Sequence, residues 1–267
     1  PVVAISFYKI MDKIMIGILT NVYEVGLYEN AEKIVNIPLV LITALGTVML
    51  PRISNLTAKG NDEKVKEYII KSIKFIMFMS FAMCCGLIAI GYNFALLFFG
   101  TEFQKTGILI MLLSVTLIFL SFANVIRTQY LIPKEKDKIY IISVCLGALI
   151  NLVMNFIFIP MYGSIGACFG TIAAEFIVMF YQSFAVRKEL PIKEYIKSII
   201  PFLIKSLIML LIIYSFNYLS MNSILRLFLQ VLIGCIVYGL LNIKYIFSIV
   251  DIKKILKNIP IIKKCLN

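Results

Sequence analysis

The stretch FIMFMSFAMCCGLIAIGYNFALLFF (Phe75–Phe99) contains no charged residue, and neither does IYIISVCLGALINLVMNFIFIP (Ile139–Pro160). A helix needs about 20 apolar residues to cross a hydrocarbon core about 30 Å thick. Both stretches reach that length, and a helix satisfies its own backbone hydrogen bonds, as lipid requires. They predict an all-α fold in which the chain forms a polytopic transmembrane helix bundle.

Similar apolar runs recur along the whole chain. Of its 267 residues, 61% are hydrophobic, and the mean hydropathy is +0.97, whereas soluble domains are about 45–50% apolar. The first run is interrupted by Lys9, Asp12 and Lys13. The runs predict about eight spans, at residues 1–20, 34–51, 75–99, 107–132, 139–160, 163–186, 199–219 and 225–243.

The basic residues alternate between the predicted loops. The formal net charge is +12, and the loops after the second, fourth, sixth and eighth spans hold six, three, four and six Lys or Arg residues. Each loop on the other side holds one or none. Because cytoplasmic loops carry the excess of Lys and Arg, both termini are expected in the cytoplasm. The charge therefore indicates topology, and no nucleic-acid partner is expected.

The sequence lacks the residues that most catalytic and metal sites use. It has no histidine, and its six cysteines form no CxxC pair, so neither metal sites nor disulfides are expected. No GxxxxGK[ST] motif is present, which argues against ATP hydrolysis within this chain. We expect no enzyme, no catalytic residue, no metal and no cofactor.

Two segments between or after the spans have an amphipathic pattern. Residues 61–74 can begin a helix at Asn61, with Val65, Ile69, Ile70 and Ile73 on one stripe. We expect this helix to lie on an anionic membrane surface, the alternative being a solvated connector. Residues 248–267 are expected to form a basic amphipathic cytoplasmic tail.

Since the chain begins at Pro1 inside an apolar stretch, without Met or a signal peptide, we expect it to be part of a longer protein.

Three groups of motifs, in this order and spacing over residues 12–175, resemble one family. The chain is similar to the polysaccharide-type (Wzx-like) flippases of the multidrug/oligosaccharidyl-lipid/polysaccharide exporter superfamily. The matching residues are Asp12–Gly17 (DKIMIG), Val25–Tyr28 (VGLY) and Ala31–Ile34 (AEKI); then Ala44–Ser54 (ALGTVMLPRIS); then Asn151–Asn155 (NLVMN), Ile159–Gly163 (IPMYG), Gly166-Ala167 and Ala174-Glu175.

The resemblance implies the C-terminal portion of a fourteen-helix transporter. Residues 1–186 would form the six-span second lobe, residues 187–247 two additional spans, and residues 248–267 the tail. The implied function is translocation of a polyprenyl-pyrophosphate-linked oligosaccharide, of the O-antigen or capsule type, across the bacterial inner membrane by alternating access. Expected partners are this lipid-linked oligosaccharide, membrane lipids, and a glycan polymerase with other assembly proteins.

Other functions remain open from the sequence. One alternative is a cation-coupled drug exporter of the same superfamily, for which an acidic cavity with few cations would be typical. Another is a non-transporting membrane partner in glycan assembly. A membrane glycan polymerase or ligase is disfavoured. Such an enzyme needs catalytic groups at the outer face, where the predicted turns are short and carry few charges.

Charged residues within the spans are the first candidates for a substrate cavity, because charge in lipid is costly. Lys9, Asp12 and Lys13 lie within one helical turn near mid-depth, so they line a cavity or, alternatively, Lys9 and Asp12 form a structural pair. Glu175 also lies near mid-depth, as a cavity or proton-linked group or as a hydrogen-bonded structural carboxyl.

Three further polar residues complete the candidate cavity. Arg127 is expected to extend to the cytoplasmic headgroups, although an inward orientation would offer its forked guanidinium to a pyrophosphate. Asn151 and Asn155 lie one turn apart on one helix face, where they bind sugar hydroxyls or hold helices together. Nearby, Gly166 and Gly170 form a small-xxx-small motif that is expected to serve packing.

Overall fold

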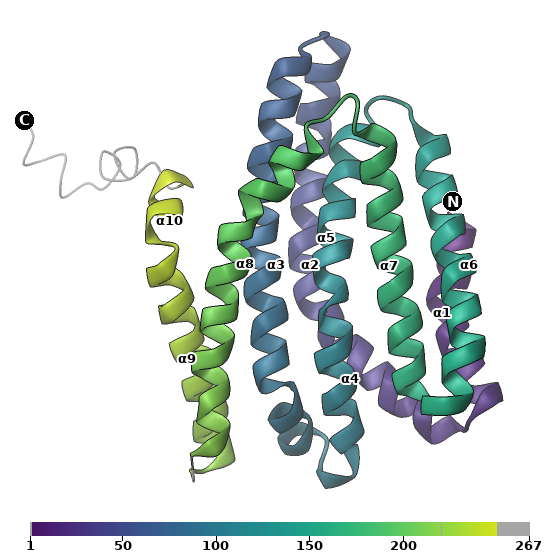
Figure 1. Ribbon diagram of the computed structural model, residues 1–267, viewed down its shortest axis with the longest axis vertical. Coiled ribbons are helices and arrows are strands. Elements are labelled where there is room, and N and C mark those ends of the chain that lie inside the picture. Colours follow the sequence, from purple (N-terminus) through teal and green to yellow (C-terminus); the bar gives the residue numbers. More distant parts are fainter. Residues whose placement is uncertain (1, 220, 250–267) are drawn as a thin grey trace, which may run out of the picture.

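The part of the chain described by the structure, a computed structural model, is entirely helical and without strands (Figure 1). It comprises residues 2–219 and 221–249, with side chains described from Ile10 to Leu219 and from Met221 to Ser248. The predicted tail at 248–267 therefore lies almost wholly outside the described residues. The helices are α1 (Val2–Leu19), α2 (Val22–Ala58), α3 (Asp62–Phe98), η1 (Thr101–Phe103), α4 (Gln104–Ser114), α5 (Thr116–Ile126), η2 (Arg127–Leu131), α6 (Asp137–Tyr162), α7 (Ser164–Val186), α8 (Ile192–Ser215), η3 (Phe216–Tyr218), α9 (Ser223–Leu241) and α10 (Ile243–Ile249).

The predicted transmembrane bundle is confirmed. Seven helical segments of the described chain are long and apolar enough to cross a membrane, and the 18-residue helix α1 lies beside them. Large apolar side chains such as Ile18, Val48 and Leu211 are 71–76% exposed, as expected where lipid is the solvent. The chain is thus a multi-pass membrane protein.

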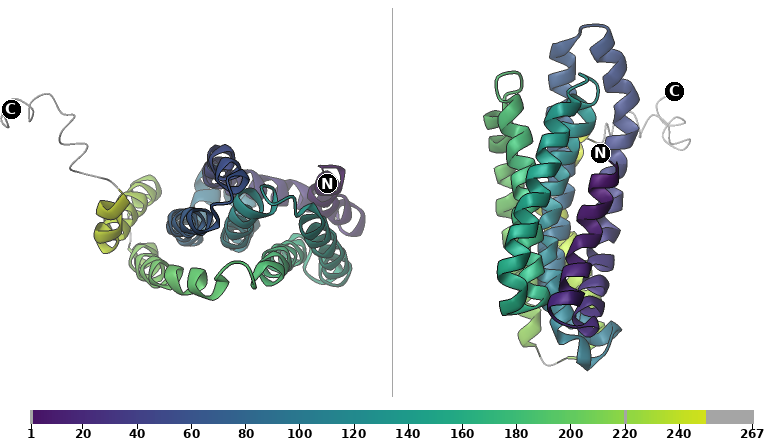
Figure 2. Two further views of the ribbon diagram at one scale, coloured as in Figure 1. Left: turned by 90° about the horizontal axis from the view of Figure 1, so that it is seen from above. Right: turned by 90° about the vertical axis from the view of Figure 1, so that its right-hand side faces the viewer.

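The turns form two groups at opposite ends of the bundle. The α2–α3, η2–α6 and α7–α8 connections, which hold the basic loops, lie together at the upper end of Figure 1. The α1–α2, α3–α4, α6–α7 and α8–α9 connections lie at the lower end. Seen from above in Figure 2, α1 is at one side of the molecule and α9 at the other.

Helices α2 and α3 are longer than the sequence suggests. Pro38 and Pro51 lie inside α2 and do not end it, although α2 changes direction along its length (Figure 1), as proline-containing helices do. Asn61 is the N-cap of α3, and its side chain accepts a hydrogen bond from the Lys64 backbone N–H.

The interfacial helix predicted at residues 61–74 is not a separate element. It is the first part of α3, which continues without a break to Phe98. Val65, Ile69 and Ile73 are at most 2% exposed and pack into a protein core with residues of α2, α5 and α8. The apolar stripe therefore faces the protein and not a membrane surface.

The helices pack around three apolar cores. One lies toward the α2–α3 hairpin and joins α2, α3, α5 and α8. A second joins α1, α2, α4, α6 and α7, and a third joins α3 to α8 and α9. The five described cysteines are free. Cys168 belongs to the second core and Cys85 to the third, and Cys84 is also buried.

An ionic contact, the Glu24 junction, ties three turns together at the lower end of Figure 1. Lys105 Nζ lies 2.7 Å from both carboxylate oxygens of Glu24. The backbone N–H and hydroxyl of Ser164 donate to the same carboxylate at 3.0 and 2.6 Å. Gly163 has φ +62, and a Cβ there would come within 2.9 Å of the Glu24 carboxylate. The junction fixes the α1–α2, α3–α4 and α6–α7 connections relative to one another.

Candidate functional site

Asp12, on α1, is the centre of a buried hydrogen-bond network. It is 5% exposed. Its Oδ1 accepts hydrogen bonds from the carboxamides of Asn151 and Asn155, at 2.9 and 2.6 Å. Its Oδ2 accepts from the hydroxyls of Thr171 and Tyr28, at 2.8 and 3.0 Å. We call these five residues the Asp12 network.

Four helices bring the network together. Asn151 and Asn155 are one turn apart on α6, so both reach the same oxygen of Asp12 on α1. Thr171 comes from α7 and Tyr28 from α2. The α6–α7 approach depends on glycine, because a Cβ at Gly170 would lie 2.2 Å from the Asn155 side-chain oxygen. The predicted packing role of the small-xxx-small motif is thus visible in the structure.

The chemistry of the network is that of a buried negative charge surrounded by neutral donors. A carboxylate in this setting is stabilised by its hydrogen bonds, and it remains able to take up a proton or a small cation. The amide and hydroxyl oxygens close to Asp12 are the hard oxygen ligands that such cations use. Asn155 Oδ1 is buried and has no hydrogen-bond partner among the described residues.

A cavity of about 110 Å³ lies beside Asp12. Its polar lining comes from Asp12, Tyr28, Glu32, Asn36, Thr116, Thr171 and Glu175. Glu32 forms an ion pair with Lys13 at 2.8 Å, and both side chains are partly exposed. Lys13 is therefore held by a carboxylate of α2 rather than by Asp12.

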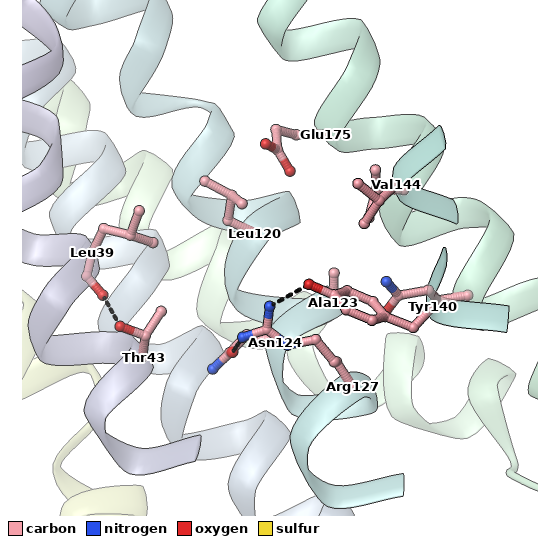
Figure 3. Close-up of a pocket in the computed structure, with 11 residues that line it drawn as sticks. Leu39, Thr43, Leu120, Ala123, Asn124, Arg127, Tyr140, Val144 and Glu175 are labelled. Atoms are coloured by element: carbon pink, nitrogen blue, oxygen red, sulfur yellow. Dashed lines mark hydrogen bonds between the residues drawn. The ribbon is translucent and has the colours of Figure 1, made fainter. Parts of the chain in front are cut away.

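A second cavity, of about 210 Å³, contains Arg127 (Figure 3). We call it the Arg127 cavity; it is lined by α2, α5, η2, α6 and α7. The guanidinium Nη2 donates to Asn124 Oδ1 at 2.7 Å, and Nη1 donates to the Tyr140 hydroxyl at 3.2 Å. Arg127 Nε is buried and has no hydrogen-bond partner in the part of the chain described.

The structure places the Arg127 side chain against other parts of the bundle. Its guanidinium bonds to Asn124, one turn earlier in the chain, and to Tyr140 of α6. This is the arrangement of the inward alternative, whose role toward a pyrophosphate stays a prediction. Figure 3 shows Arg127 and Tyr140 meeting in the cavity, with Glu175 entering it from α7. A fixed cation, an aromatic hydroxyl and a carboxylate thus share one small space.

Glu175 joins the two cavities. It is 8% exposed, and it lines both the cavity beside Asp12 and the Arg127 cavity, together with Leu39 and Leu120. The two cavities are therefore neighbours, and Glu175 is the polar residue that they share.

A third, apolar groove of about 560 Å³ runs between α3, α8 and α9. Its lining includes Phe78, Met83, Met209 and Tyr238, with Gln230 as a buried polar group. Sequence analysis did not predict this groove, because it forms where α3 packs against α8 and α9, which are far from α3 in sequence.

The structure brings together most of the residues predicted for the cavity. Asp12, Asn151 and Asn155 are in direct contact, and Glu175 and Arg127 line the neighbouring Arg127 cavity. Lys9 lies outside the described side chains, so its pairing with Asp12 stays a prediction. The lining residues that sequence reasoning missed include Tyr28, Glu32, Asn124, Tyr140, Thr171 and Gln182. Of these, Tyr28 and Glu32 stood in the recognised motifs VGLY and AEKI and could have been found there.

Comparison with known proteins gives a consistent result. The family model for the lipid II flippase MurJ matches residues 5–238. A probable low-salt glycan biosynthesis flippase, Agl15 of Haloferax volcanii, is 24% identical, over 90% of this chain and 51% of the relative. A putative O-antigen transporter of Shigella dysenteriae is 24% identical, over 69% of this chain and 46% of the relative.

The fold is also that of a solved structure. Lipid II flippase MurJ in an inward closed conformation superimposes with a TM-score of 0.80 at 23% identity, covering 93% of this chain and 52% of that one. The chain thus spans about half the length of the curated relatives it matches. On its sequence match over residues 5–238, the chain belongs to the lipid II flippase MurJ family.

Proposed function

We propose that this chain is one half of a transporter that moves a polyprenyl-pyrophosphate-linked oligosaccharide across the bacterial inner membrane by alternating access. Family membership supports a transporter rather than an enzyme. The observation that carries the substrate class is Arg127, a fixed cation that lines a cavity of mixed polar and apolar lining within the membrane-spanning bundle.

The physical reason is the cost of moving a charged headgroup. A pyrophosphate that leaves water for a low-dielectric cavity loses its hydration, and a positioned guanidinium offsets that loss with paired, directional hydrogen bonds. The apolar groove between α3, α8 and α9 is suited to an isoprenoid chain, because almost all of its lining is apolar. A headgroup site and an apolar groove in one chain match the two parts of such a substrate.

We assign different roles to the polar residues. Asn151 and Asn155 direct their amide groups to Asp12, which supports helix holding rather than sugar binding. We assign the binding of sugar hydroxyls to residues that line the Arg127 cavity, namely Asn124, Tyr140, Glu175 and Gln182. Lys13 acts through its ion pair with Glu32, and Lys9 stays a proposed cationic residue of the substrate cavity.

The proposed arrangement in the membrane has both termini in the cytoplasm. The upper end of Figure 1, which carries the basic loops, then faces inward. Residues 1–186 form the second lobe, 187–247 two additional spans, and 248–267 a cytoplasmic tail. Membrane lipids, a glycan polymerase and other assembly proteins complete the list of partners.

A cation-coupled drug exporter of the same superfamily is the second candidate. The Asp12 network favours it, because a buried carboxylate surrounded by neutral donors is suited to a proton or a small cation. Arg127 argues against it, since a cationic drug would meet a like charge in the cavity. A lipid-linked glycan transporter driven by a cation would use both features.

The test is restoration of surface glycan in a host that lacks its own flippase. We expect the longer protein that contains this chain to restore it, and residues 1–267 alone not to, because a single lobe cannot rock against a partner. The Arg127→Gln variant of the longer protein should fail at equal membrane abundance. Restoration by that variant, or drug export without glycan export, would favour the second candidate.

A further inference from the structure

Helix α2 crosses the α5–η2 segment at Gly46, and the crossing leaves no room for a side chain. A Cβ on Gly46 would lie 2.7 Å from Asn124 Nδ2 and 3.0 Å from Thr128 Oγ1. Real Cβ atoms essentially never come as close as 2.7 Å to another heavy atom. By contrast, a Cβ on Gly26 of the same helix would meet nothing within 4 Å.

The group that occupies this space is the Asn124 carboxamide, the same group that holds Arg127. Its Oδ1 accepts the 2.7 Å hydrogen bond from Arg127 Nη2. Its Nδ2 is buried and has no hydrogen-bond partner among the described residues. Buried polar groups are normally paired, so an unpaired amide nitrogen is unusual. Hydrogen bonds hold this carboxamide only on its oxygen side. Packing against the bare backbone at Gly46 fixes it instead.

The backbone beneath Arg127 adds to this dependence. Residues Arg127–Leu131 form a π-helical turn, in which the Ile132 N–H donates to the Arg127 carbonyl at 3.0 Å. Thr128 Oγ1 donates to the Asn124 carbonyl at 2.7 Å. Turns of this kind interrupt the regular helix and are frequent at functional sites. Thus the guanidinium projects from an irregular turn, and Asn124 is the neighbour that restrains it from the same helix.

We propose that Gly46 is a positioning residue for the Arg127 cavity: by lacking a side chain, it lets α2 press the Asn124 carboxamide into the place where it holds the guanidinium. This inference rests on the proposed function, in which Arg127 receives the anionic headgroup. It makes the position of α2 part of the anion site, so a displacement of α2 at this crossing loosens Arg127.

The experiment measures equilibrium binding of radiolabelled inorganic pyrophosphate to the longer protein that contains this chain, purified in lipid nanodiscs. Gly46→Ala should push the amide away and weaken binding about tenfold, the lower end for losing a hydrogen bond to a charged group. Gly26→Ala is the matched control on α2 and should bind like the wild type. Thermal unfolding of each variant reports whether it is folded.

A double-mutant cycle separates positioning from a general packing defect. In an Asn124→Ala background, which already lacks the restraint, Gly46→Ala should cause no further loss of affinity. An equal loss in both backgrounds, or wild-type binding by Gly46→Ala, would overturn the inference. Should Gly46→Ala fail to fold, the double variant should recover folding with weak binding, and its failure to do so would also count against Gly46.

The proposed function has a separate outcome in the same assay. Arg127→Gln should abolish most pyrophosphate binding whatever stands at residue 46. If Arg127→Gln binds like the wild type, or the wild type does not bind, the anion site itself is wrong and the inference falls with it. If Arg127→Gln loses binding and Gly46→Ala does not, only the role of Gly46 is refuted.

Discussion

Replacing Asp12 tests whether the buried network holds the bundle together. In Asp12→Ala, the carboxamides of Asn151 and Asn155 lose their shared acceptor, while the hydroxyls of Tyr28 and Thr171, 3.0 Å apart, can pair with each other. Asn155 keeps a 3.1 Å bond to Asn151. With buried unpaired donors costing about 1–3 kcal/mol each, we expect Asp12→Ala to lower the free energy of unfolding by about 3 kcal/mol.

The Asp12→Asn variant separates shape from charge. Its side-chain oxygen can still accept from both carboxamides, and its amide can donate to the hydroxyl oxygens of Thr171 or Tyr28. Only the charge-assisted part of the bonds is lost, so the expected cost is about 1 kcal/mol. The assay is equilibrium unfolding of the purified chain in mixed detergent micelles. Equal costs for Ala and Asn, or no cost for Ala, would refute the reasoning.

Three other predictions concern the rest of the chain. A cysteine replacing Asn222 in a variant without native cysteines should react with an impermeant label only from the outer side; labelling from the cytoplasmic side alone would invert the topology. Glu24→Gln should lower the free energy of unfolding by about 1–3 kcal/mol because it breaks the Glu24 junction. The matched control, Glu29→Gln at an exposed ion pair, should lower it by less than about 0.5 kcal/mol. Equal costs would contradict a stabilising role of the Glu24 junction. Hydrogen bonds from Lys136 and Tyr130 lower the pKa of Glu189 below its usual 4.5. Its stabilisation is therefore fully present above about pH 4.5, is lost as the pH falls through the lower folded-state pKa, and is below about 1 kcal/mol because the side chain is exposed. A Glu189→Gln variant should be less stable than the wild type at pH 6 in thermal unfolding, and the difference should shrink as the pH falls below 4.5; a difference that grows on acidification would contradict this.

The bundle could be predicted from the sequence because hydropathy reports directly on the length of each apolar run. The runs at Phe75–Phe99 and Ile139–Pro160 correspond to parts of α3 and α6. The start of α3 was misjudged because a charged, amphipathic segment has the same pattern whether its stripe faces lipid headgroups or a protein core. Packing of Val65, Ile69 and Ile73 decides between the two, and packing is not a local property.

Sequence reasoning could point to the charged residues of the candidate site but not to most of their neighbours or to their contacts. Burial cost alone singles out Asp12, Arg127 and Glu175. The partners of Asp12 lie 16, 139, 143 and 159 residues away in sequence. They are beyond the reach of i,i+3 and i,i+4 spacing, which suggested only Lys9 as a partner. For Arg127, the deciding contact with Tyr140 comes from the next helix.

The most direct test of the central claim is the flipping of a fluorescent lipid-linked oligosaccharide in proteoliposomes made with the longer protein that contains this chain. If Arg127 receives the pyrophosphate, Arg127→Gln should raise KM by about 10- to 150-fold, as expected for losing a charged hydrogen bond worth about 1.5–3 kcal/mol. Arg127→Lys should be intermediate, because it keeps the charge without the fork. Arg187→Gln, an exposed arginine near the same end of the bundle, is the control and should leave transport unchanged. Flipping by Arg127→Gln with the wild-type KM and rate, at equal amounts of folded protein, would contradict the account.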